Sequence, residues 1–371
     1  MLLALAAIAA AYQVFALVAC LAFRRTHKAG AHLARSGISI LKPVRGADPA
    51  LRAAVASHVA LPGVRQAGVA QAGVAQGGEV EILCGVRDLA DSAVAVLREF
   101  TSVRIVECTT QTPNGKVGTL IDLARAARYD TLVVNDADIR VEPDYLDRVT
   151  APLADPGVGL VTCLYRPEGD TFAARFEGLG VATDFAPSTL AARLVGVDEF
   201  AMGSTLAFRR ADLERIGGFE AIGDYLADDY QLGHRLHSLG LRCALSDAIV
   251  STRLSGNWKQ IWTHQVRWAR TIRVSRFAGY LGLPVTFATC WAVVLAAAGQ
   301  WELAAAVLAL RLSMALAGGW LVLRHRDTLL LLPLIPLRDL FGAAVWAAGI
   351  FGDTVEWRGT RLRLRRDGKI G

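Results

Sequence analysis

The sequence has few charged residues, and its cysteines lack the spacing typical of a cross-linked or zinc-binding protein. Of the 371 residues, 20% are charged and 53% are hydrophobic, which excludes a disordered chain and a nucleic-acid-binding tail. The six cysteines are scattered and form no C-x-x-C pair. The sequence therefore predicts neither a disulfide framework nor a zinc site, and the cysteines are interpreted as small apolar side chains in a reducing compartment.

A long apolar run lies at the start of the chain. Met1–Phe23 is almost uninterrupted by polar residues and is followed directly by Arg24 and Arg25. About 20 apolar residues are enough to cross a bilayer, so residues 1–23 are predicted to be a transmembrane anchor. A cleaved signal peptide is the alternative, but its charges precede a shorter apolar core. The cations after the anchor predict that the chain continues in the cytoplasm.

The C-terminal third is apolar again. Leu281–Gly299 and Leu303–Leu323 are long enough to span a membrane, whereas Thr328–Gly352 is interrupted by two prolines and by Arg338 and Asp339. Two spans would leave the strongly basic tail in the cytoplasm, and a third full span would not. We therefore expect the proline-broken segment to be a re-entrant hairpin in which Arg338 and Asp339 pair inside the protein.

The chain between these ends predicts one α/β domain. Its short apolar runs, each bounded by turn residues, are Ile38–Leu41, Val80–Leu83, Val103–Val106, Thr131–Val134 and Gly159–Thr162. Helical stretches such as Leu120–Arg128 alternate with them, which predicts a parallel sheet covered on both faces. The pentapeptide repeated over Gln66–Ala75 is interpreted as an expanded surface loop. The predicted divisions are an anchor (1–23), a cytoplasmic domain (37–255), an amphipathic helix (256–280), membrane segments (281–352) and a basic cytoplasmic tail (353–371).

Carboxylates follow two of the predicted strands. Asp136 and Asp138 come directly after Thr131–Val134. They could share a divalent cation that in turn holds phosphates. A solvated turn is the alternative, but ligands of such sheets lie beyond the carboxyl ends of the strands. Asp88 follows Val80–Leu83 and could accept hydrogen bonds from a nucleobase or ribose. It could also cap the next helix, although Asp91 suits that cap better.

Two further polar groups precede helical stretches. Asn114 and Lys116 lie in a polar loop, where a lysine can approach a diphosphate as a point charge or simply be solvated. Asp228 and Asp229 open a predicted helix over Asp229–Leu239, where acids favour the positive end of the helix dipole. Packed beside another carboxylate, one of them could have a raised pKa and act as a general base.

The segment 256–280 combines large apolar residues with arginines at every third position. It is interpreted as a basic amphipathic helix on an anionic lipid surface. That interpretation accounts less well for Arg267 and Trp268, which lie side by side at the polar border and follow His264.

Taken in order, these motifs resemble the inverting glycosyltransferases of families 2 and 21, especially the ceramide glucosyltransferase branch. The shared elements, in order, are Asp88, Asn114-x-Lys116, Asp136-x-Asp138, Asp228-Asp229 and a box ending in Arg267-Trp268. Within that branch, residues 138–146, 159–166 and 267–273 look most like bacterial hopanoid-biosynthesis enzymes, which attach N-acetylglucosamine to bacteriohopanetetrol. Ceramide glucosylation is the close alternative.

The resemblance implies a GT-A fold, with a Rossmann-like, mostly parallel sheet between an N-terminal transmembrane helix and C-terminal membrane helices. It also implies Mg²⁺ or Mn²⁺ as cofactor and a role for each matched residue. Asp88 and Lys116 would bind the uridine diphosphate part, and Asn114, Asp228 and His264 would also bind substrate. Asp136 would bind the nucleotide-sugar and share the metal with Asp138. Asp229 would deprotonate the acceptor, while Arg267 and Trp268 would hold the diphosphate and the acceptor. His264 stands where the family usually has Gln or Arg, and Gly118-Thr119 replaces a commoner Asn pair.

The expected protein is a UDP-sugar-dependent lipid glycosyltransferase of the bacterial inner membrane, with its catalytic domain facing the cytoplasm. Its expected partners are a UDP-sugar, a membrane lipid acceptor and the bilayer, and no nucleic acid. A processive polysaccharide synthase is a rival, but it needs a channel built from more spans. A scaffold without turnover is a second rival, which the acids at Asp136, Asp138 and Asp229 disfavour.

Overall fold

A computed structural model describes residues 2–25, 37–64, 78–357 and 359–371. The chain divides into two compact units, and each is described by itself. The sheet unit comprises Lys28–Tyr165 and Asp198–Thr252, and the helical unit comprises Met1–His27, Arg166–Val197 and Arg253–Gly371. The stretch 166–197, which we expected in the cytoplasmic domain, therefore belongs to the helical unit. The repeated pentapeptide lies outside the described residues.

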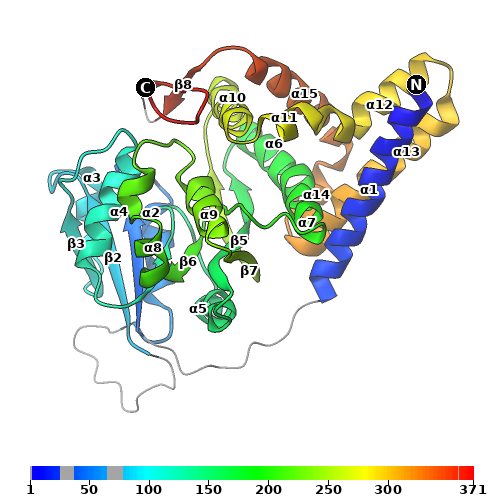
Figure 1. Cartoon of the computed structure of the whole chain (residues 1–371). Helices are drawn as coiled ribbons and strands as arrows, with labels where there is room; N and C mark the ends of the chain where they lie inside the picture. The colour runs from blue at the N-terminus through cyan, green and yellow to red at the C-terminus, as the bar shows by residue number, and fades with distance from the viewer. Residues whose placement is uncertain (1, 26–36, 65–77, 358) are drawn as a thin grey trace. The chain divides into compact units, whose positions relative to one another are not determined.

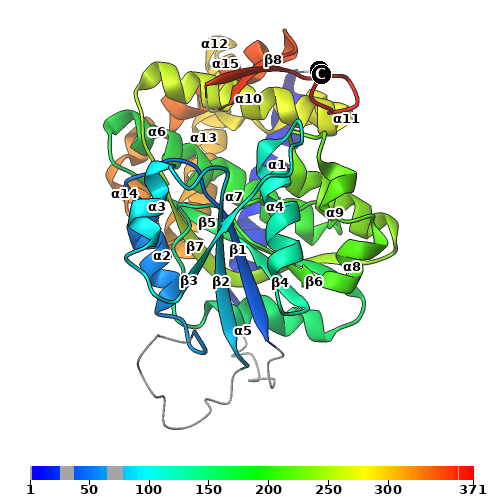
Figure 2. The ribbon, with the colours of Figure 1, turned by 90° about the vertical axis from the view of Figure 1, so that its left-hand side faces the viewer.

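The sheet unit is built on a mixed but mostly parallel sheet. Among the described residues it has seven strands in the order β3-β2-β1-β4-β6-β5-β7 (Figure 2). Their bounds are β1 Ile38–Pro43, β2 Val80–Val86, β3 Val103–Glu107, β4 Thr131–Val134, β5 Val158–Gly169, β6 Leu206–Arg209 and β7 Arg242–Leu254. Strands β3, β2, β1 and β4 are parallel, and β6 is antiparallel to both β4 and β5. The mostly parallel sheet is confirmed, with β6 inserted between two of the predicted strands.

Helices cover both faces of this sheet, as the alternation of buried side chains requires. Ile40 of β1 packs in the cluster formed with α2, α3 and α5, whereas its neighbour Leu41 packs in the opposite cluster with α4 and α9. Figure 2 shows α2 and α3 on one side of the strands and α4, α8 and α9 on the other. The bounds are α2 Leu51–Val59, α3 Ser92–Leu97, α4 Gly115–Ala126, α5 Tyr145–Thr150, α8 Arg210–Arg215, η3 Phe219–Ile222 and α9 Asp228–Ser238.

The helical unit contains the apolar ends of the chain. Helix α1 contacts α7, α12 and α13 (Figure 1). The bounds are α1 Leu2–Arg25, α6 Phe172–Gly180, η2 Val181–Phe185, α7 Ala186–Leu194, α10 Trp258–Ser275, α11 Phe277–Gly282, η4 Leu283–Thr286, α12 Ala288–Ala297, α13 Trp301–Ala315, η5 Leu316–Val322, α14 Asp327–Leu330, η6 Leu332–Leu334 and α15 Ile335–Ile350.

Three helical segments of the described residues are long and apolar enough to cross a membrane: Leu2–Arg24, Trp301–Val322 and Leu332–Ile350. A fourth, Phe277–Thr286 with Ala288–Ala297, is bent by 48° at its break. The predicted hairpin within Thr328–Gly352 is therefore wrong, because this stretch contains one continuous candidate span. Its prolines lie in the first turns of η6 and α15, where a missing backbone N–H costs no hydrogen bond.

The predicted pairing of Arg338 with Asp339 is also corrected. The Asp339 carboxylate accepts two hydrogen bonds from Arg311, at 2.6 and 2.9 Å. Arg338 instead donates from Nη2 to Gln265 Oε1 at 3.0 Å. Adjacent residues on a helix point about 100° apart, so the two side chains reach different partners.

The end of the chain forms a β-hairpin, β8 Thr354–Trp357 with β9 Thr360–Arg363. The connection into it is bound to α10. Arg270 Nε donates to the Phe351 carbonyl at 3.0 Å, and Arg273 Nη2 donates to the Gly352 carbonyl at 2.6 Å. Two of the arginines expected on a lipid surface therefore bind the C-terminal segment.

Candidate functional site

The site in the sheet unit forms at the carboxyl edge of the parallel strands. Asp136 and Asp138 follow β4, and Lys42 lies near the end of the neighbouring strand β1. Lys42 is fully buried, and its Nζ donates to the Asp136 carbonyl at 2.9 Å. Burial lowers the pKa of Lys42 to about 8, against the opposing effect of nearby acidic groups that include Asp138 and Asp136. Lys42 thus holds the turn that carries both carboxylates.

Lys116 projects from the first turn of α4, which corrects the predicted loop. Asn114 is the N-cap of this helix. Its Oδ1 accepts from the amides of Lys116 and Val117, at 3.1 and 3.4 Å, and its Nδ2 donates to the Tyr225 carbonyl at 2.8 Å. Because Asn114 is fully buried and bonded at both ends of its amide, it positions Lys116 instead of presenting a free polar group.

Lys116 lies between carboxylates from two other elements. Its Nζ is 2.9 Å from Asp136 Oδ1 and 3.1 Å from Asp228 Oδ2. These charges, together with Asp229, raise the pKa of Lys116 against the opposing effect of burial. One ammonium group therefore connects the turn after β4 with the first turn of α9.

Asp229 is held by backbone amides. Its Oδ2 accepts from Gly203 N and its Oδ1 from Tyr230 N, both at 2.8 Å. Burial, and then the charge of Asp228, raise the pKa of Asp229 to about 6, although Lys116 and the amide hydrogen bonds oppose the shift. A carboxylate with this pKa is ionised at neutral pH and still able to take up a proton, as a general base must.

Gly203, just before β6, lies at the centre of this cluster. A Cβ at this position would be 3.2 Å from Asp229 Oδ2, 3.5 Å from Lys116 Nζ and 3.7 Å from Asp136 Oδ2. The three predicted side chains therefore surround a single point of the backbone. With Asp228, which Lys116 contacts at 3.1 Å, they form one site of four residues, here called the acid cluster: Lys116, Asp136, Asp228 and Asp229.

Asp138 lies beside the acid cluster. Burial, and then repulsion by Asp136, raise the pKa of its carboxyl, although the Thr252 hydroxyl donates to Oδ2. A divalent cation between Asp136 and Asp138 would remove this repulsion, so the donor set fits a metal. Among the described residues no group of three or more His, Cys, Asp or Glu could hold one. In proteins Mg²⁺ is commonly bound through one or two carboxylates, with substrate phosphates supplying further oxygens.

Asp88 lies in the exposed loop after β2, at the same edge of the sheet. Its Oδ1 accepts from the Ala90 amide at 2.7 Å. The N-cap of α3 is Asp91, whose side chain accepts from Ala93 N. The expectation that Asp91 caps this helix is confirmed, and the role of Asp88 in nucleotide binding stays a prediction.

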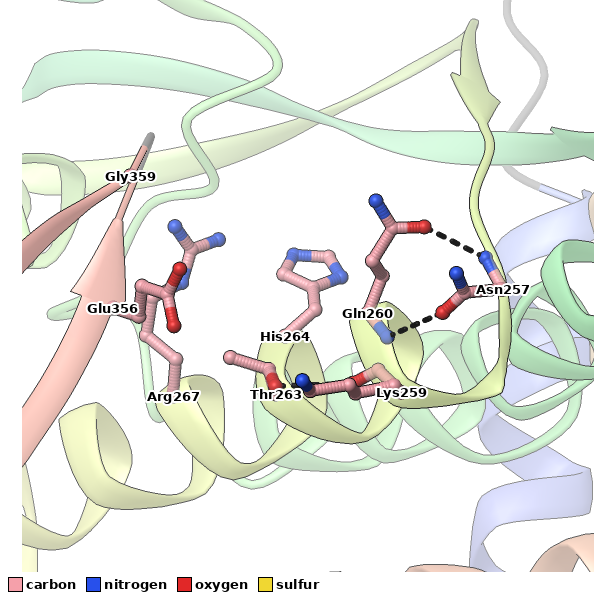
Figure 3. Close-up of a pocket in the computed structure, with 8 residues that line it drawn as sticks. All are labelled: Asn257, Lys259, Gln260, Thr263, His264, Arg267, Glu356 and Gly359. Atoms are coloured by element: carbon pink, nitrogen blue, oxygen red, sulfur yellow. Dashed lines mark hydrogen bonds between the residues drawn. The ribbon is translucent and has the colours of Figure 1, made fainter.

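His264, Arg267 and Trp268 lie on α10 of the helical unit. His264 and Arg267 line a pocket of about 550 Å³ with the N-terminal turns of α10 and the β8-β9 hairpin. Figure 3 shows the imidazole and guanidinium projecting into it from one side of the helix, with Glu356 of β8 nearby. The Trp268 ring packs edge-on against the His264 ring, with centroids 4.6 Å apart.

Sequence similarity to known proteins assigns the chain to a family. The model of glycosyl transferase family 21 matches residues 1–370. The chain belongs to this family. Ceramide glucosyltransferase 1 and Ceramide glucosyltransferase 3 of Caenorhabditis elegans are 27% and 25% identical to it over 233 residues. The match covers 60% of this chain and about half of each relative, 47% and 48%. Family membership makes this chain a glycosyltransferase and leaves its substrates to be proposed.

A solved structure shares the fold of this family 21 chain. The mannosyltransferase PcManGT from Pyrobaculum calidifontis, in complex with GDP-Man and Mn²⁺, is 22% identical and has a TM-score of 0.53. The similarity covers 94% of this chain and 98% of the other. The expected GT-A fold with an N-terminal apolar helix is confirmed.

Sequence reasoning missed Lys42, Gly203, Thr252 and Glu177, the last of which is hydrogen-bonded to His264. Lys42 had a usable signal, because a lysine inside an apolar strand is buried only with a partner. The other three had none, since their importance comes from contacts with residues far along the chain.

Proposed function

We propose that this chain transfers a sugar from a UDP-sugar to the hydroxyl of a membrane lipid, with inversion at the anomeric carbon. The observation that carries the proposal is the placement of Asp229, with its raised pKa, beside the Lys116 ammonium and the Asp136 turn. This arrangement offers a base and a diphosphate-binding charge at one edge of the sheet.

In the proposed reaction Asp229 takes the proton of the lipid hydroxyl while that oxygen forms a bond to the anomeric carbon. The bond from this carbon to the phosphate oxygen breaks on the opposite face, and UDP leaves with the electron pair. The amides of Gly203 and Tyr230 hold the two carboxylate oxygens in place. Lys116 stabilises charge on the diphosphate.

Asp136 and Asp138 are the proposed metal ligands. Mg²⁺ or Mn²⁺ bound there would neutralise charge on the departing diphosphate. Lys42 fixes the turn between the two carboxylates through the Asp136 carbonyl.

Removal of the base tests the mechanism. Asp229→Asn should abolish transfer and leave UDP binding, measured by calorimetry, nearly unchanged. Glu214→Gln, on the exposed face of α8, is the matched control and should retain both. Unchanged turnover in Asp229→Asn would refute the assignment, and metal-independent turnover after EDTA treatment would refute the proposed metal.

Two lipid acceptors are proposed with equal support. Bacteriohopanetetrol is the acceptor implied by the hopanoid resemblance, and ceramide is the acceptor implied by the curated relatives. The purified enzyme would be incubated with UDP-glucose or UDP-N-acetylglucosamine and with each lipid, and products read by mass spectrometry. A lipid-linked monosaccharide supports the proposal, and a soluble polymer would favour the processive synthase instead.

We also propose that the acid cluster and the C-terminal tail face the bacterial cytoplasm. The contacts of Arg270 and Arg273 with the segment after α15 support placing the tail on the same side as α10. An even number of full crossings must then separate them. Trp301–Val322 and Leu332–Ile350 meet this requirement if the bent pair Phe277–Ala297 is re-entrant. A reporter fused after Gly371 should read as cytoplasmic, and a periplasmic signal would refute this topology.

A further inference from the structure

Glu177 is a buried acid of α6 with no part in the chemistry above. Its side chain is 2% exposed. Its Oε1 accepts from His264 Nδ1 at 2.6 Å and from Gln265 Nε2 at 2.8 Å. Burial alone would raise the pKa of this carboxyl, but the hydrogen bonds from His264 and Gln265 and the charge of Arg338 lower it overall. Glu177 is therefore an ionised carboxylate that accepts hydrogen bonds from two side chains of α10.

This carboxylate orients the His264 ring. An ionised carboxylate only accepts hydrogen bonds, so Nδ1 carries the proton that points to Glu177. Nε2 lies at the other side of the ring, which lines the pocket shown in Figure 3. The edge contact with Trp268, at 4.6 Å between centroids, places the indole against the same fixed ring.

Other residues carry the charge of the pocket that His264 lines. Lys259 and Arg267 line the same pocket and supply its positive charge, with Glu356 as the acid of the β8 wall. Arg338 donates a hydrogen bond to Gln265, which in turn donates one to Glu177. An anion entering the pocket would be held by Lys259 and Arg267. In a neutral imidazole whose Nδ1 carries the proton, Nε2 has the lone pair that can accept from a hydroxyl.

We infer that Glu177 is a positioning residue, which holds His264 so that Nε2 accepts a hydrogen bond from a substrate hydroxyl in the α10 pocket. The inference rests on the proposed function. The hydroxyl could belong to the transferred sugar or to the lipid acceptor, and the experiment separates these sources.

The test compares Glu177→Leu, which cannot accept from Nδ1–H, with His264→Ala and the double variant, using the full chain in nanodiscs. Gln265→Met is the control: it removes the other hydrogen bond to Glu177, together with the one that Gln265 accepts from Arg338, and leaves the His264 contact in place. Loss of one hydrogen bond should weaken binding about tenfold. If the sugar supplies the hydroxyl, UDP-sugar affinity falls and UDP affinity does not. If the lipid supplies it, KM for the lipid rises and both nucleotide affinities stay unchanged.

The effects should be non-additive, with the double variant no worse than His264→Ala alone. Nitrogen NMR of ¹⁵N-histidine-labelled protein, with His264 assigned from His264→Ala, should show the Nδ1–H tautomer in the wild type and its loss in Glu177→Leu, which has no acceptor for Nδ1–H. This spectrum does not depend on turnover, so it tests the inference even if the proposed function fails. An unchanged spectrum, equal weakening of UDP and UDP-sugar binding, or no effect on any substrate would overturn the inference.

Discussion

The pKa of Asp229 should set the acidic limb of the pH profile, and its neighbours should move that limb in opposite directions. The pKa is raised from 3.8 to about 6, a shift of about 2 units that corresponds to about 3 kcal/mol. A base acts only when ionised, so kcat/KM should rise with pH through about 6. Burial is the largest cause of the shift and the Asp228 charge the second.

Asp228→Asn should therefore shift the midpoint of the acidic limb to lower pH. The shift should be less than about one pH unit, because the burial of Asp229 persists. Lys116→Met should shift the same midpoint to higher pH, because the cation that favours the ionised carboxylate of Asp229 is lost. Initial rates would be measured in mixed micelles at fixed lipid fraction between about pH 4.5 and 8, with Glu214→Gln as control. Movement of both variants in the same direction, or of neither, would refute the electrostatic account of Asp229.

Three further variants test other parts of the structure. Gly203→Ala puts a Cβ 3.2 Å from Asp229 Oδ2 and should lower kcat about tenfold by displacing reacting groups. Gly282→Ala, with nothing within 4 Å, should not. Asn114→Ala removes the cap of α4 and should cost about 1–2 kcal/mol in thermal unfolding; an unchanged midpoint would contradict its structural role. Arg311→Met leaves the buried Asp339 without its cationic partner and should cost about 3–5 kcal/mol, which Arg311→Met with Asp339→Leu should largely restore.

The local elements of the fold could be predicted because their signals lie within short segments. The runs that begin at Ile38, Val80, Val103 and Thr131 each became a strand, and the apolar Met1–Phe23 became α1. The prediction of a hairpin within Thr328–Gly352 was wrong because local composition does not fix where a proline lies within a turn. Whether Pro333 and Pro336 break a helix or begin one depends on their position within the turn, which apolar content does not specify.

By itself the sequence determined the apolar helices, the parallel core of the sheet and the acids at its carboxyl edge, because periodicity, length and chain order are local properties. Only the tertiary structure decided that Gly203 lies among Lys116, Asp136 and Asp229, and that Glu177 bonds His264. Those contacts join residues separated by tens of positions, and their strength depends on burial and on the charges that surround them. No spacing along the chain encodes either.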